Sequence, residues 1–576
     1  MSGRTRITAT IKVRSPFLFP AVDVAAAGLD ASPLRMPDGT PVLPGDHIRG
    51  HLRHVAEAEN EAVARKLFGW KSDENSNEPE RGALIISDFI ATGFSTTDNR
   101  TGNDFKSERA LSYRVAIDDE TSAAKDGMLK VIELVAAPET TVTFKGTIIL
   151  RHGNQKTDID TASIEQLLRS IDAVGAQKTS GFGEIESVEC TAVELDHTPA
   201  ANAGDTVTLD LSISGPFIVD AGRDAFNFYR GSTVIPGSAL KGMIAEHLMD
   251  AGVIGKQDAN LSKIHISHAW PLVSGKLGDR AVHEHRAVSP KDDRFVTRAE
   301  VDAAFAAGGT PAFPTDWKDW AGRRAALGRP GSDLLRQARV RTAIAKKGNE
   351  KEGTADDGML FVETAIVPQD AKWRVTLSRN GADQGTFDHV VGALLQGTHG
   401  LGKTGAHVTA ERVQSPPAQP PTVQAGRIAV MLETPAILTE IETVVSLDHD
   451  KPAMRKTLKD KYAAYFSMLL PNSRLMSVHG GDQIIGRYYG YRFGTKNKYT
   501  PFCMTRAGTV FELDVGPGDV AALTACLQSG LPPVFEGALL QDPVSNWGKV
   551  PMVPTNGYGE ISLVGALAAS AKVAKP

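Results

Sequence analysis

Alternating apolar and polar positions open three separate stretches of the chain. Apolar residues take every second position at 7–13, at 207–213 and at 428–432. This alternation is typical of a β-strand with one face on a hydrophobic core. A proline step follows shortly after each run, at Pro16, Pro216 and Pro435. The pattern predicts three strands in corresponding positions, and therefore an internal repeat.

The same three stretches close on a shared glycine motif, Thr-x-Gly-apolar-Gly. Its copies lie at 179–183, 398–402 and 555–559. A helical pattern of apolar residues precedes the first two copies, and a strand-like run follows them at 185–190 and 407–413. We therefore expect a glycine loop that joins a helix to a strand in each repeat.

The first two repeats share further motifs. Residues 44–50 read Pro-Gly-Asp-His-Ile-Arg-Gly and residues 236–242 read Pro-Gly-Ser-Ala-Leu-Lys-Gly, and each of these Pro-Gly boxes predicts a turn that leads into a helix. Asp-Gly-Met-Leu occurs at 126–129 and again at 357–360. The longer separation in the second repeat indicates an insertion within 243–340. Its last part carries a basic run, Arg336 and Arg339, which Arg341 continues.

Composition fits a soluble protein of several domains. The 576 residues are too many for one core, because a domain typically holds about 150. Hydrophobic residues make up 41% and charged residues 23%, which excludes a wholly disordered chain. The net charge of −5 argues against a generally basic nucleic-acid coat but leaves room for a local basic groove. Three distant cysteines and the lack of a long apolar run predict a cytoplasmic protein without disulfides or membrane contact.

One segment matches a phosphate-binding loop letter for letter. Residues 397–404 read Gly-Thr-His-Gly-Leu-Gly-Lys-Thr. Such a loop binds nucleotide phosphates when it follows a strand and opens a helix. Here the predicted order is helix, loop and strand, and the other two glycine motifs lack the Lys-Thr pair. We therefore do not expect ATP binding.

The glycine loops and the Pro-Gly boxes are candidates for contact with RNA phosphates. Glycine has no Cβ, so its backbone can approach a phosphodiester closely. Lys178 and Lys403 add positive charge beside two loops, and Arg49 and Lys241 take matching places early in the two box helices. Ordinary tight turns are the alternative, but repetition at corresponding places favours RNA contact.

For each of two groups of side chains the sequence allows two interpretations. His265, His268 and His-Glu-His at 283–285 do not have the spacing of a zinc motif, so a solvated or RNA-facing cluster is favoured over a metal site. Three aromatic residues ahead of the second box either stack on bases or pack in the core. They are Phe226, Phe228 and Tyr229.

Together these motifs resemble the RAMP superfamily of CRISPR-associated proteins. The resemblance rests on the opening strand, the Pro-Gly box, Ile-Ser-Asp at 86–88, Arg-Val-Ala-Ile-Asp at 114–118, Asp-Gly-Met-Leu and the closing glycine loop. The first two repeats look most like the backbone subunits of type III effector complexes. In that family each domain is a modified RRM, a ferredoxin-like β-α-β-β-α-β unit, with its glycine loop between the last helix and the last strand.

The resemblance implies an α+β protein of three tandem RRM/ferredoxin-like RAMP domains with inserted thumb-like segments. Their expected bounds are 1–195, 206–413 with the insertion within 243–340, and 425–565. The third lacks a Pro-Gly box and is similar to the RAMP domain that caps the 5′ end of a guide RNA. We expect the RNA-distorting hairpins at 96–106 and in the insertion.

In this family an aspartate in the loop before the box cuts target RNA. Gly-Leu-Asp-Ala-Ser-Pro-Leu-Arg at 28–35 is similar to that loop with one extra residue, so the resemblance assigns catalysis to Asp30. Asp224 lies in the shorter loop of the second repeat without the matching context, and is a weaker candidate. For each, an ordinary surface-loop aspartate is the alternative. The implied cofactor is a divalent metal, Mg²⁺.

The resemblance also collects the expected RNA-binding residues. They come from the boxes, the glycine loops and the basic segment of the third repeat. They are Arg49, Arg53, Lys178, Gly181, Phe182, Gly183, Ser238, Lys241, Gly400, Gly402, Lys403, Arg487, Arg492, Gly557, Tyr558 and Gly559.

The implied function is that of a type III CRISPR effector subunit that binds guide RNA and cleaves complementary target RNA. Its expected partners are guide RNA, target RNA and other type III effector subunits. The first alternative is a guide-RNA scaffold without nuclease activity, which Asp30 distinguishes. The second is a guide-processing endonuclease, which would use a histidine-centred site in a smaller protein. Three repeats, and the lack of a histidine near the end of the first strand, disfavour it.

Overall fold

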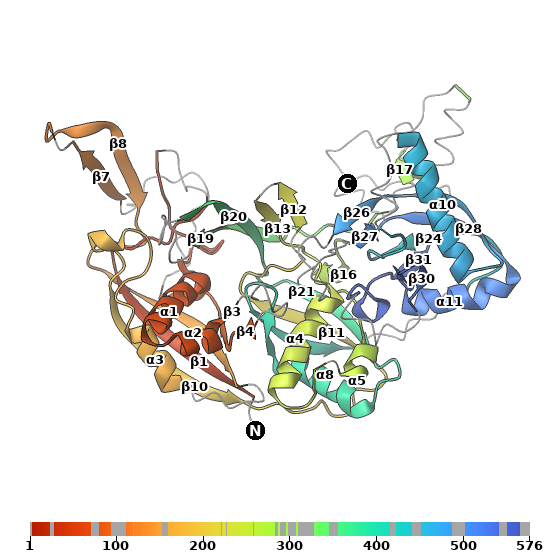
Figure 1. Ribbon diagram of the computed structural model, residues 1–576, viewed down its shortest axis with the longest axis horizontal. Coiled ribbons are helices and arrows are strands. Elements are labelled where there is room, and N and C mark those ends of the chain that lie inside the picture. The colour runs from red at the N-terminus through yellow and green to blue at the C-terminus, as the bar shows by residue number, and fades with distance from the viewer. Residues whose placement is uncertain are drawn as a thin grey trace.

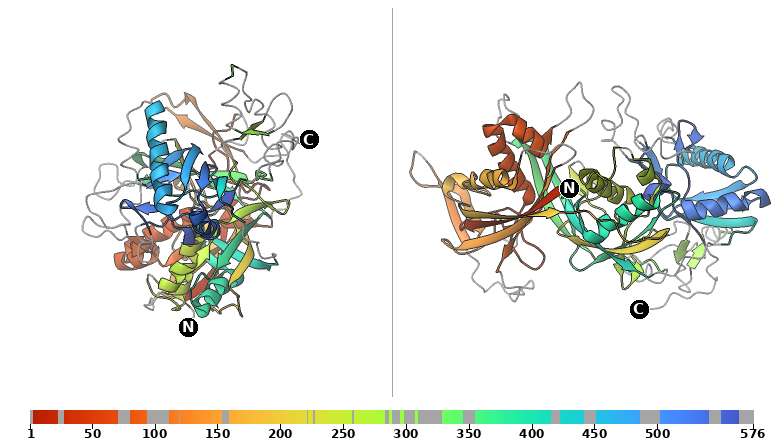
Figure 2. Two further views of the ribbon diagram at one scale, coloured as in Figure 1. Left: turned by 90° about the vertical axis from the view of Figure 1, so that its right-hand side faces the viewer. Right: turned by 90° about the horizontal axis from the view of Figure 1, so that it is seen from below.

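Three antiparallel sheets, each with its own hydrophobic core, follow one another along the chain in the computed structural model (Figure 1). We call them, with the helices on them, the first, second and third unit. They form an elongated row, which Figure 2 shows from two further directions. The structure describes residues 3–22, 28–70, 80–93, 111–118, 120–152, 159–220, 222–225, 227–256, 258–282, 286–288, 295–297, 307–308, 328–344, 355–414, 422–440, 451–485, 502–540 and 550–564.

The first unit begins with the predicted alternating strand. Ile7, Ala9, Ile11 and Val13 are fully buried on one face of β1 and belong to the core. Asp160 caps helix α3 by accepting from the Ser163 N–H at 2.8 Å. The elements are β1 (Arg4–Arg14), β2 (Val42–Leu43), α1 (Gly45–Glu59), α2 (Glu61–Phe68), β3 (Gly69–Trp70), β4 (Glu80–Arg81), β5 (Leu84–Ile86), β6 (Phe89–Thr92), β7 (Leu111–Ile117), β8 (Ala124–Glu133), β9 (Thr141–Arg151), α3 (Thr161–Arg169) and β10 (Ile185–Leu195).

The second unit repeats this sequence of elements with additions. Asp383 caps helix α8 through the Thr386 N–H, as Asp160 caps α3. Its elements are β11 (Thr206–Ser214), β12 (Gly222–Ala225), β13 (Phe228–Arg230), α4 (Gly237–Asp250), α5 (Ala259–Lys263), β14 (His265–Ile266), β15 (Trp270–Val273), β16 (Lys276–Leu277), β17 (Arg286–Val288), β18 (Phe295–Thr297), β19 (Leu335–Ile344), β20 (Ala355–Val367), β21 (Lys372–Ser378), α8 (Gln384–Gln396), β22 (Thr398–Leu401) and β23 (Ala406–Val413).

The third unit has a smaller sheet and a core rich in aromatic residues. Tyr462, Tyr465 and Phe466 of its long helix pack with Phe511 of the sheet. Its elements are β24 (Gly426–Leu432), α10 (Lys451–Leu469), β25 (Arg474–His479), β26 (Asp482–Ile485), β27 (Phe502–Thr505), β28 (Val510–Val515), α11 (Val520–Ser529), β29 (Val534–Phe535), β30 (Ala538–Leu539) and β31 (Ile561–Leu563).

One strand order recurs in all three sheets. The first strand lies between the last strand and the strand before the last helix: β10-β1-β9, β23-β11-β21 and β31-β24-β28. The strand that follows the first helix pairs with the strand before the last helix, on the side away from the first strand. β5 pairs with β9 in this way, and β25 with β28. This mixed helix and antiparallel-sheet arrangement is consistent with an RRM-like fold.

The Pro-Gly boxes begin helices α1 and α4, as the sequence predicts. Pro44 and Pro236 take the N-cap positions with φ of −63° and −60°, which the proline ring favours. A Cβ on Gly45 would lie 2.3 Å from the Ser87 carbonyl oxygen, and one on Gly237 would lie 2.1 Å from that of Ile266. Glycine is therefore needed where each helix start packs against a strand end.

Two hairpins depart from the sheets at matching places. The β7–β8 hairpin projects from the first unit (Figure 1), and Leu129 of Asp-Gly-Met-Leu pairs there with Val115. In the second unit Leu360 of the same motif pairs with Thr342 in the β19–β20 hairpin. β19 begins inside the insertion where a hairpin was expected, whereas 96–106 lies outside the described residues. Within the described part of the chain, no helix is long and apolar enough to cross a membrane.

Candidate nucleic-acid interface

Asp30 lies at the base of the β7–β8 hairpin. Its backbone N–H donates to the Val131 carbonyl at 2.8 Å, and its Oδ2 accepts from the Val131 N–H at 2.6 Å. The next residue, Ala31, forms a parallel bridge with Ile132. Asp30 is nevertheless exposed. The structure thus holds this carboxylate in a fixed position while leaving it open to a ligand from solvent.

A small hydrophobic cluster joins the Asp30 segment, the hairpin and the glycine loop of the first unit. It consists of Leu18, Ile132, Leu134 and Phe182, with Ala31 and Ala176 packed against it. Arg114 of β7 adds a polar link, since its Nη1 donates to Ser180 Oγ at 2.9 Å and its guanidinium lies 4.7 Å from the Phe182 ring centroid. These three segments lie far apart in the sequence, and the fold brings them together in one site.

The glycine loop of this site has an open half and a packed half. Residues 178–181 are exposed, and a Cβ on Gly181 would meet no described atom within 4 Å. A Cβ on Gly183 would lie 1.8 Å from the Val174 carbonyl oxygen, and the Phe182 side chain is buried. The expectation that the whole loop faces RNA is corrected accordingly: Lys178 and Gly181 face solvent, whereas Phe182 and Gly183 pack inside the protein.

The second unit has a phenylalanine at the position of Asp30. Val362 follows the second Asp-Gly-Met-Leu motif as Val131 follows the first, and its parallel partner is Phe228. Asp224 lies earlier, in β12, and its side chain is outside the described part of the structure. Its predicted catalytic role therefore has no support from the position of Asp30. The side chain of Tyr229 lies 5.2 Å from Lys403 Nζ, measured to the ring centroid.

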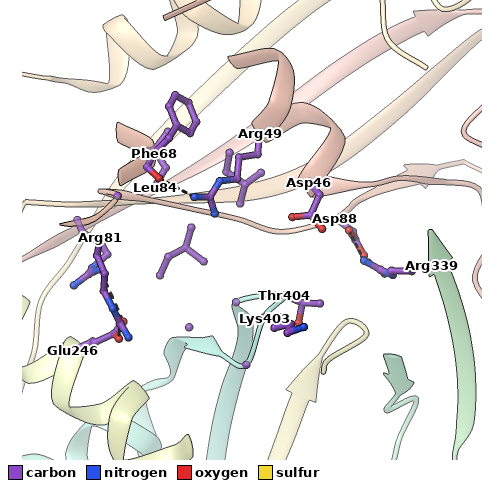
Figure 3. Close-up of a pocket in the computed structure, with 17 residues that line it drawn as sticks. Asp46, Arg49, Phe68, Arg81, Leu84, Asp88, Glu246, Arg339, Lys403 and Thr404 are labelled. Atoms are coloured by element: carbon purple, nitrogen blue, oxygen red, sulfur yellow. Dashed lines mark hydrogen bonds and ion pairs between the residues drawn. The ribbon is translucent and has the colours of Figure 1, made fainter. Parts of the chain in front are cut away.

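A cavity between the first and second units gathers four predicted RNA-binding residues (Figure 3). Arg49 comes from α1, while Gly400, Gly402 and Lys403 come from the second glycine loop. The sequence places them in separate repeats, and the fold brings them together. Its charged lining residues are Arg49, Arg81, Arg151, Arg339 and Lys403, with Asp46, Asp88 and Glu246.

Ion pairs hold the two sides of this cavity together. Arg339 of β19 pairs with Asp88 at 2.5 Å (Figure 3), and Arg341 pairs with Asp46 at 2.6 Å. Arg81 pairs with Glu246 of α4. Within the second unit, Lys403 Nζ lies 2.5 Å from a Glu363 carboxylate oxygen. Part of the positive charge is thus neutralised by protein. Arg49 forms no ion pair with another described residue, and its Nη2 donates to the Phe68 carbonyl at 2.9 Å.

The segment with the phosphate-loop sequence has the predicted order of elements. Helix α8 precedes it and β23 follows it. A Cβ on Gly402 would lie 2.2 Å from the Ile218 carbonyl oxygen, to which the Lys403 N–H donates at 3.0 Å. The loop therefore packs on its own unit. It does not open a helix, whereas a loop that binds nucleotide phosphates lies at a helix N-terminus.

Between the second and third units the predicted RNA contacts are contacts within the protein. Lys241 Nζ donates to the Thr555 carbonyl at 2.8 Å, and Ser238 Oγ lies 3.3 Å from Tyr558 Oη. Burial lowers the pKa of Lys241 to about 7. A Cβ on Gly557 would lie 2.6 Å from the backbone nitrogen of His268. The expectation that Ser238, Lys241 and Tyr558 face phosphates is corrected, because these groups join two units.

The last glycine of that loop is packed as well. A Cβ on Gly559 would lie 2.7 Å from the Leu531 carbonyl oxygen. At the second boundary the Pro-Gly box and the adjacent strand end of the second unit therefore lie against the glycine loop of the third unit. At the first boundary the glycine loop of the second unit faces Ile85 of β5, and the box residues Asp46 and Arg49 line the same cavity as that loop. We call each such contact a joint. Sequence analysis finds both halves of a joint but not their pairing, since they belong to different repeats.

The histidines that looked metal-like belong to the second joint. His268 is 4% exposed, and its ring stands edge-on to that of Tyr558 with centroids 4.8 Å apart. Burial lowers the pKa of His268 to about 3 and that of His265 to about 4. Across the described residues no three His, Cys, Asp or Glu side chains are arranged to hold a metal ion. Residues 283–285 lie outside the description.

The remaining candidates divide into one exposed residue and two that are not described. Arg53 on α1 forms an exposed pair with Glu57 at 2.7 Å. Arg487 and Arg492 lie outside the described residues. Sequence reasoning missed Arg81 and Arg151, which carry no motif. It had a signal for Arg339, which lies in the basic run.

Comparison with known proteins finds a family match in the first part of the chain. Residues 10–186 match the family model of the RAMP superfamily. The match includes the Asp30 segment, the β7–β8 hairpin and the glycine loop at 178–183, so the whole Asp30 site lies within the matched residues. No curated protein sequence matches the chain.

Two solved structures are similar at a low level. One is a cryo-EM structure of the type III-B Cmr-beta bound to cognate target RNA and AMPPnP, with 10% identity and a TM-score of 0.29 over 53% of this chain and 86% of the other. The second is the type III-B Cmr-beta bound to cognate target RNA, with 11% identity and a TM-score of 0.24 over 32% of this chain and 96% of the other.

Proposed function

We propose that this chain is a subunit of a type III CRISPR effector complex that binds guide RNA and cleaves complementary target RNA. In this proposal three tandem RAMP domains, at 1–195, 206–413 and 425–565, bind the RNA, and the third holds the 5′ end of the guide. The RAMP match at 10–186 and the strand order common to all three units support it. The observation that carries the cleavage is Asp30, an exposed carboxylate fixed between a projecting hairpin and a glycine loop.

The proposed reaction is attack by a ribose 2′-oxygen of the target on the adjacent phosphorus. The P–O2′ bond forms as the P–O5′ bond breaks, the 2′ proton passes to a base and the leaving O5′ takes up a proton. The products are a 2′,3′-cyclic phosphate and a 5′-hydroxyl. Asp30 Oδ2 is held by the Val131 N–H, so Oδ1 receives or positions the 2′ hydroxyl group.

The hairpin supplies the alignment in this proposal. Attack requires the 2′-oxygen, phosphorus and O5′ in line, which a regular duplex prevents, so a nucleotide must leave the stack. Tyr113, Val115 and Leu129 form an exposed apolar surface on β7–β8 next to Asp30. Val340 and Leu360 are exposed on the second hairpin. Apolar groups of this kind can take the place of a displaced base.

The site fits Mg²⁺ in one respect. Mg²⁺ keeps several waters and takes one or two carboxylates together with substrate phosphates. A single exposed carboxylate with one oxygen fixed by a backbone N–H matches that need, and Asp30 would hold the ion together with the RNA. When bound, the metal supplies positive charge beside the reacting phosphate.

Guide RNA binding draws on the exposed cations. Lys178 and Gly181 offer a charge and an unobstructed backbone beside the Asp30 site. Arg49 lines the cavity of the first joint. Such contacts position RNA through its backbone without reading its sequence.

Asp30→Asn tests the proposal. The asparagine oxygen still accepts from the Val131 N–H, but the charge is lost. We expect the rate of target cleavage to fall by ~10²–10⁴, as for loss of a positioned acid–base group. Guide and target affinity should stay the same or rise slightly, because a negative charge near phosphates is removed. Gel analysis of labelled target and filter binding measure the two effects.

Asp38→Asn is the matched control. Asp38 lies in the same segment, is exposed and also accepts from a backbone N–H, that of Thr40. Normal cleavage by Asp38→Asn and loss in Asp30→Asn would support the assignment. If Asp30→Asn cuts every site at the unmodified rate, the assignment of catalysis to Asp30 is wrong. The alternative of a guide-RNA scaffold, with the cut made by another subunit, then takes its place. A second product that persists in Asp30→Asn and disappears in Asp224→Asn would assign cleavage to the second unit as well.

A further inference from the structure

A glutamine of the second unit is hydrogen-bonded to the segment of the first unit that carries Asp30. Gln337 is the third residue of β19 and is 8% exposed. Its Nε2 donates to the Arg35 carbonyl at 2.8 Å. Arg35 ends the segment 28–35, in which Asp30 lies. The first joint therefore reaches the candidate cleavage site as well as the cavity between the two units.

A chain of polar contacts fixes the orientation of this glutamine. Gln337 Oε1 accepts from Arg339 Nε at 3.1 Å and from its Nη2 at 2.8 Å, so the amide nitrogen faces Arg35. Arg339 in turn pairs with Asp88 (Figure 3). Asp88 Oδ1 accepts from the Gly45 N–H at the start of α1 at 3.0 Å. A buried amide that is bonded at both ends is held rigidly, and Gln337 is thus a fixed donor.

The Arg35 end of this contact leads back to Asp30. Arg35 Nη2 lies 3.4 Å from Glu133 Oε1 of β8, and the Glu133 N–H donates to the Ala31 carbonyl at 3.0 Å. Asp30 bonds to Val131 in the same strand. The segment from Asp30 to Arg35 is therefore tied to β8 at both ends, so a displacement of Arg35 also displaces Asp30.

In the second unit the corresponding carbonyl, that of Thr233, has a donor from its own unit. In each unit the N–H of the preceding residue donates to the carbonyl three residues after the proline that follows the opening strand. These bonds join Leu34 to Phe19 and Ser232 to Val219. The Thr233 carbonyl accepts from Trp373 Nε1 of β21 at 2.8 Å. That unit has Phe228 at the position of Asp30, so the donor from a neighbouring unit is found in the unit that carries the carboxylate.

We infer that Gln337 is a positioning residue for cleavage in the first unit, and that it keeps Asp30 in place through the Arg35 carbonyl. Arg339 contributes by fixing the amide of Gln337. This role rests on the proposed function and adds to it that the Asp30 site is complete only when the second unit is docked on the first. Gln337 itself acts on the backbone of the segment and not on the reacting atoms.

Gln337→Glu removes the donor alone. A carboxylate still accepts from Arg339, so this variant keeps that contact and loses the bond to Arg35. We expect the single-turnover rate constant for cleavage of a bound target by the guide-loaded chain to fall by about 10- to 10²-fold, the size of effect that a displacement of about 1 Å produces. The Kd for target RNA should not change. Gln337→Met, which is uncharged and also lacks the donor, should behave in the same way.

A double variant shows whether Gln337 acts through Asp30. The chain with both Asp30→Asn and Gln337→Glu should cut no more slowly than Asp30→Asn alone, because a group that is already lost cannot be misplaced. Gln396→Met is the matched control. Gln396 Nε2 donates to the Thr198 carbonyl at 2.7 Å in the connection between the first two units, so this variant should cut at the normal rate. Guide RNA that co-purifies at the normal level shows that each variant is folded and loaded.

The contrary results separate this inference from the proposed function. A normal rate in both Gln337 variants, with slow cleavage by Asp30→Asn, would remove the role of Gln337 and leave the proposed function standing. A weaker Kd with an unchanged rate constant would assign Gln337 to target binding and also overturn the inference. So would losses that multiply in the double variant, since the two residues would then act independently. A normal rate in Asp30→Asn would overturn the proposed function and the inference with it.

Discussion

Two glycines in the loop at 178–183 have opposite surroundings. Gly181 and Gly183 have φ of 79° and 75°, in the left-handed region that residues with a Cβ disfavour. Only Gly183 also faces backbone, since its Cβ would lie 1.8 Å from the Val174 carbonyl oxygen. Backbone atoms cannot move aside as the end of a side chain can. At the scale of the residue, the same motif thus combines a position that maintains the fold with one that is free to meet a ligand.

Alanine substitutions should separate these roles. Gly181→Ala introduces the backbone strain alone and should lower the free energy of unfolding by about 1 kcal/mol. Gly183→Ala adds a steric clash, and the loss should reach about 3 kcal/mol or more. Chemical unfolding, monitored through hydrogen exchange in β10, measures the loss of unfolding free energy in both variants. Equal effects of the two substitutions would contradict this assignment.

At the scale of the element, helix α4 carries a histidine whose protonation opposes folding. His247 is 6% exposed, and its Nε2 lies 3.2 Å from His197 Nδ1. Burial, and then the charges of Arg4 and His197, lower the pKa of His247 to about 3. An unfolded histidine has an ordinary pKa of about 6.5. Between these values the unfolded chain binds more protons, so stability is lost as the pH falls through this window.

His247→Gln should reduce that acid sensitivity. Glutamine cannot titrate, whereas His247 should cost about 2 kcal/mol of stability between pH 7 and pH 5. We therefore expect the melting temperature of the variant to fall less than that of the unmodified chain when the pH is lowered from 7 to 5. Parallel pH dependences in the two proteins would show that His247 is protonated in the folded state.

Elements were largely predictable from the sequence, whereas their partners were not. Alternation placed β1, β11 and β24, and the Pro-Gly boxes placed the starts of α1 and α4, because periodicity and turn chemistry are local properties. The burial of Phe182 and the contacts of Lys241 depend on residues far away in the chain. From the sequence alone, a lysine early in a helix that faces a phosphate cannot be distinguished from one that faces the carbonyl of another unit.

In the candidate site, too, the local motif could be predicted from the sequence, whereas contacts between distant segments could not. The resemblance singled out Asp30 from its local motif, and the structure adds the Val131 N–H that fixes it. The motif gave no equal basis for Asp224, and strand register places Phe228 at the position of Asp30 in the second unit. Register is set by pairing between strands, which a single short motif does not encode.

At the scale of the whole molecule, buried charge holds the first joint. Arg4 lies 2.7 Å from the Asp250 carboxylate, and Arg151 lies 2.8 Å from the same Oδ2. The side chains of Arg4 and Asp250 are 2% and 4% exposed. Removing one member of a buried pair leaves the other charge without compensation, which typically costs about 3–5 kcal/mol.

Asp250→Ala should therefore loosen the contact between the first and second units. We expect a loss of about 3 kcal/mol or more in the stability of the joint, read as faster hydrogen exchange in β22 and at the start of β1. Asp205→Ala removes the exposed partner of Arg379 and should cost about 0–1 kcal/mol. Similar exchange in both variants would contradict the role of Asp250.

The connection between β10 and β11 lowers the affinity that the first joint needs. It spans 196–205 and keeps the second unit beside the first, so each meets the other at an effective concentration of about millimolar. The first joint can therefore stay closed even if its intrinsic affinity is weak. Cutting the chain within 196–205 would remove this effect without touching any residue of the joint, and the two units would then separate on dilution if their intrinsic affinity is weak.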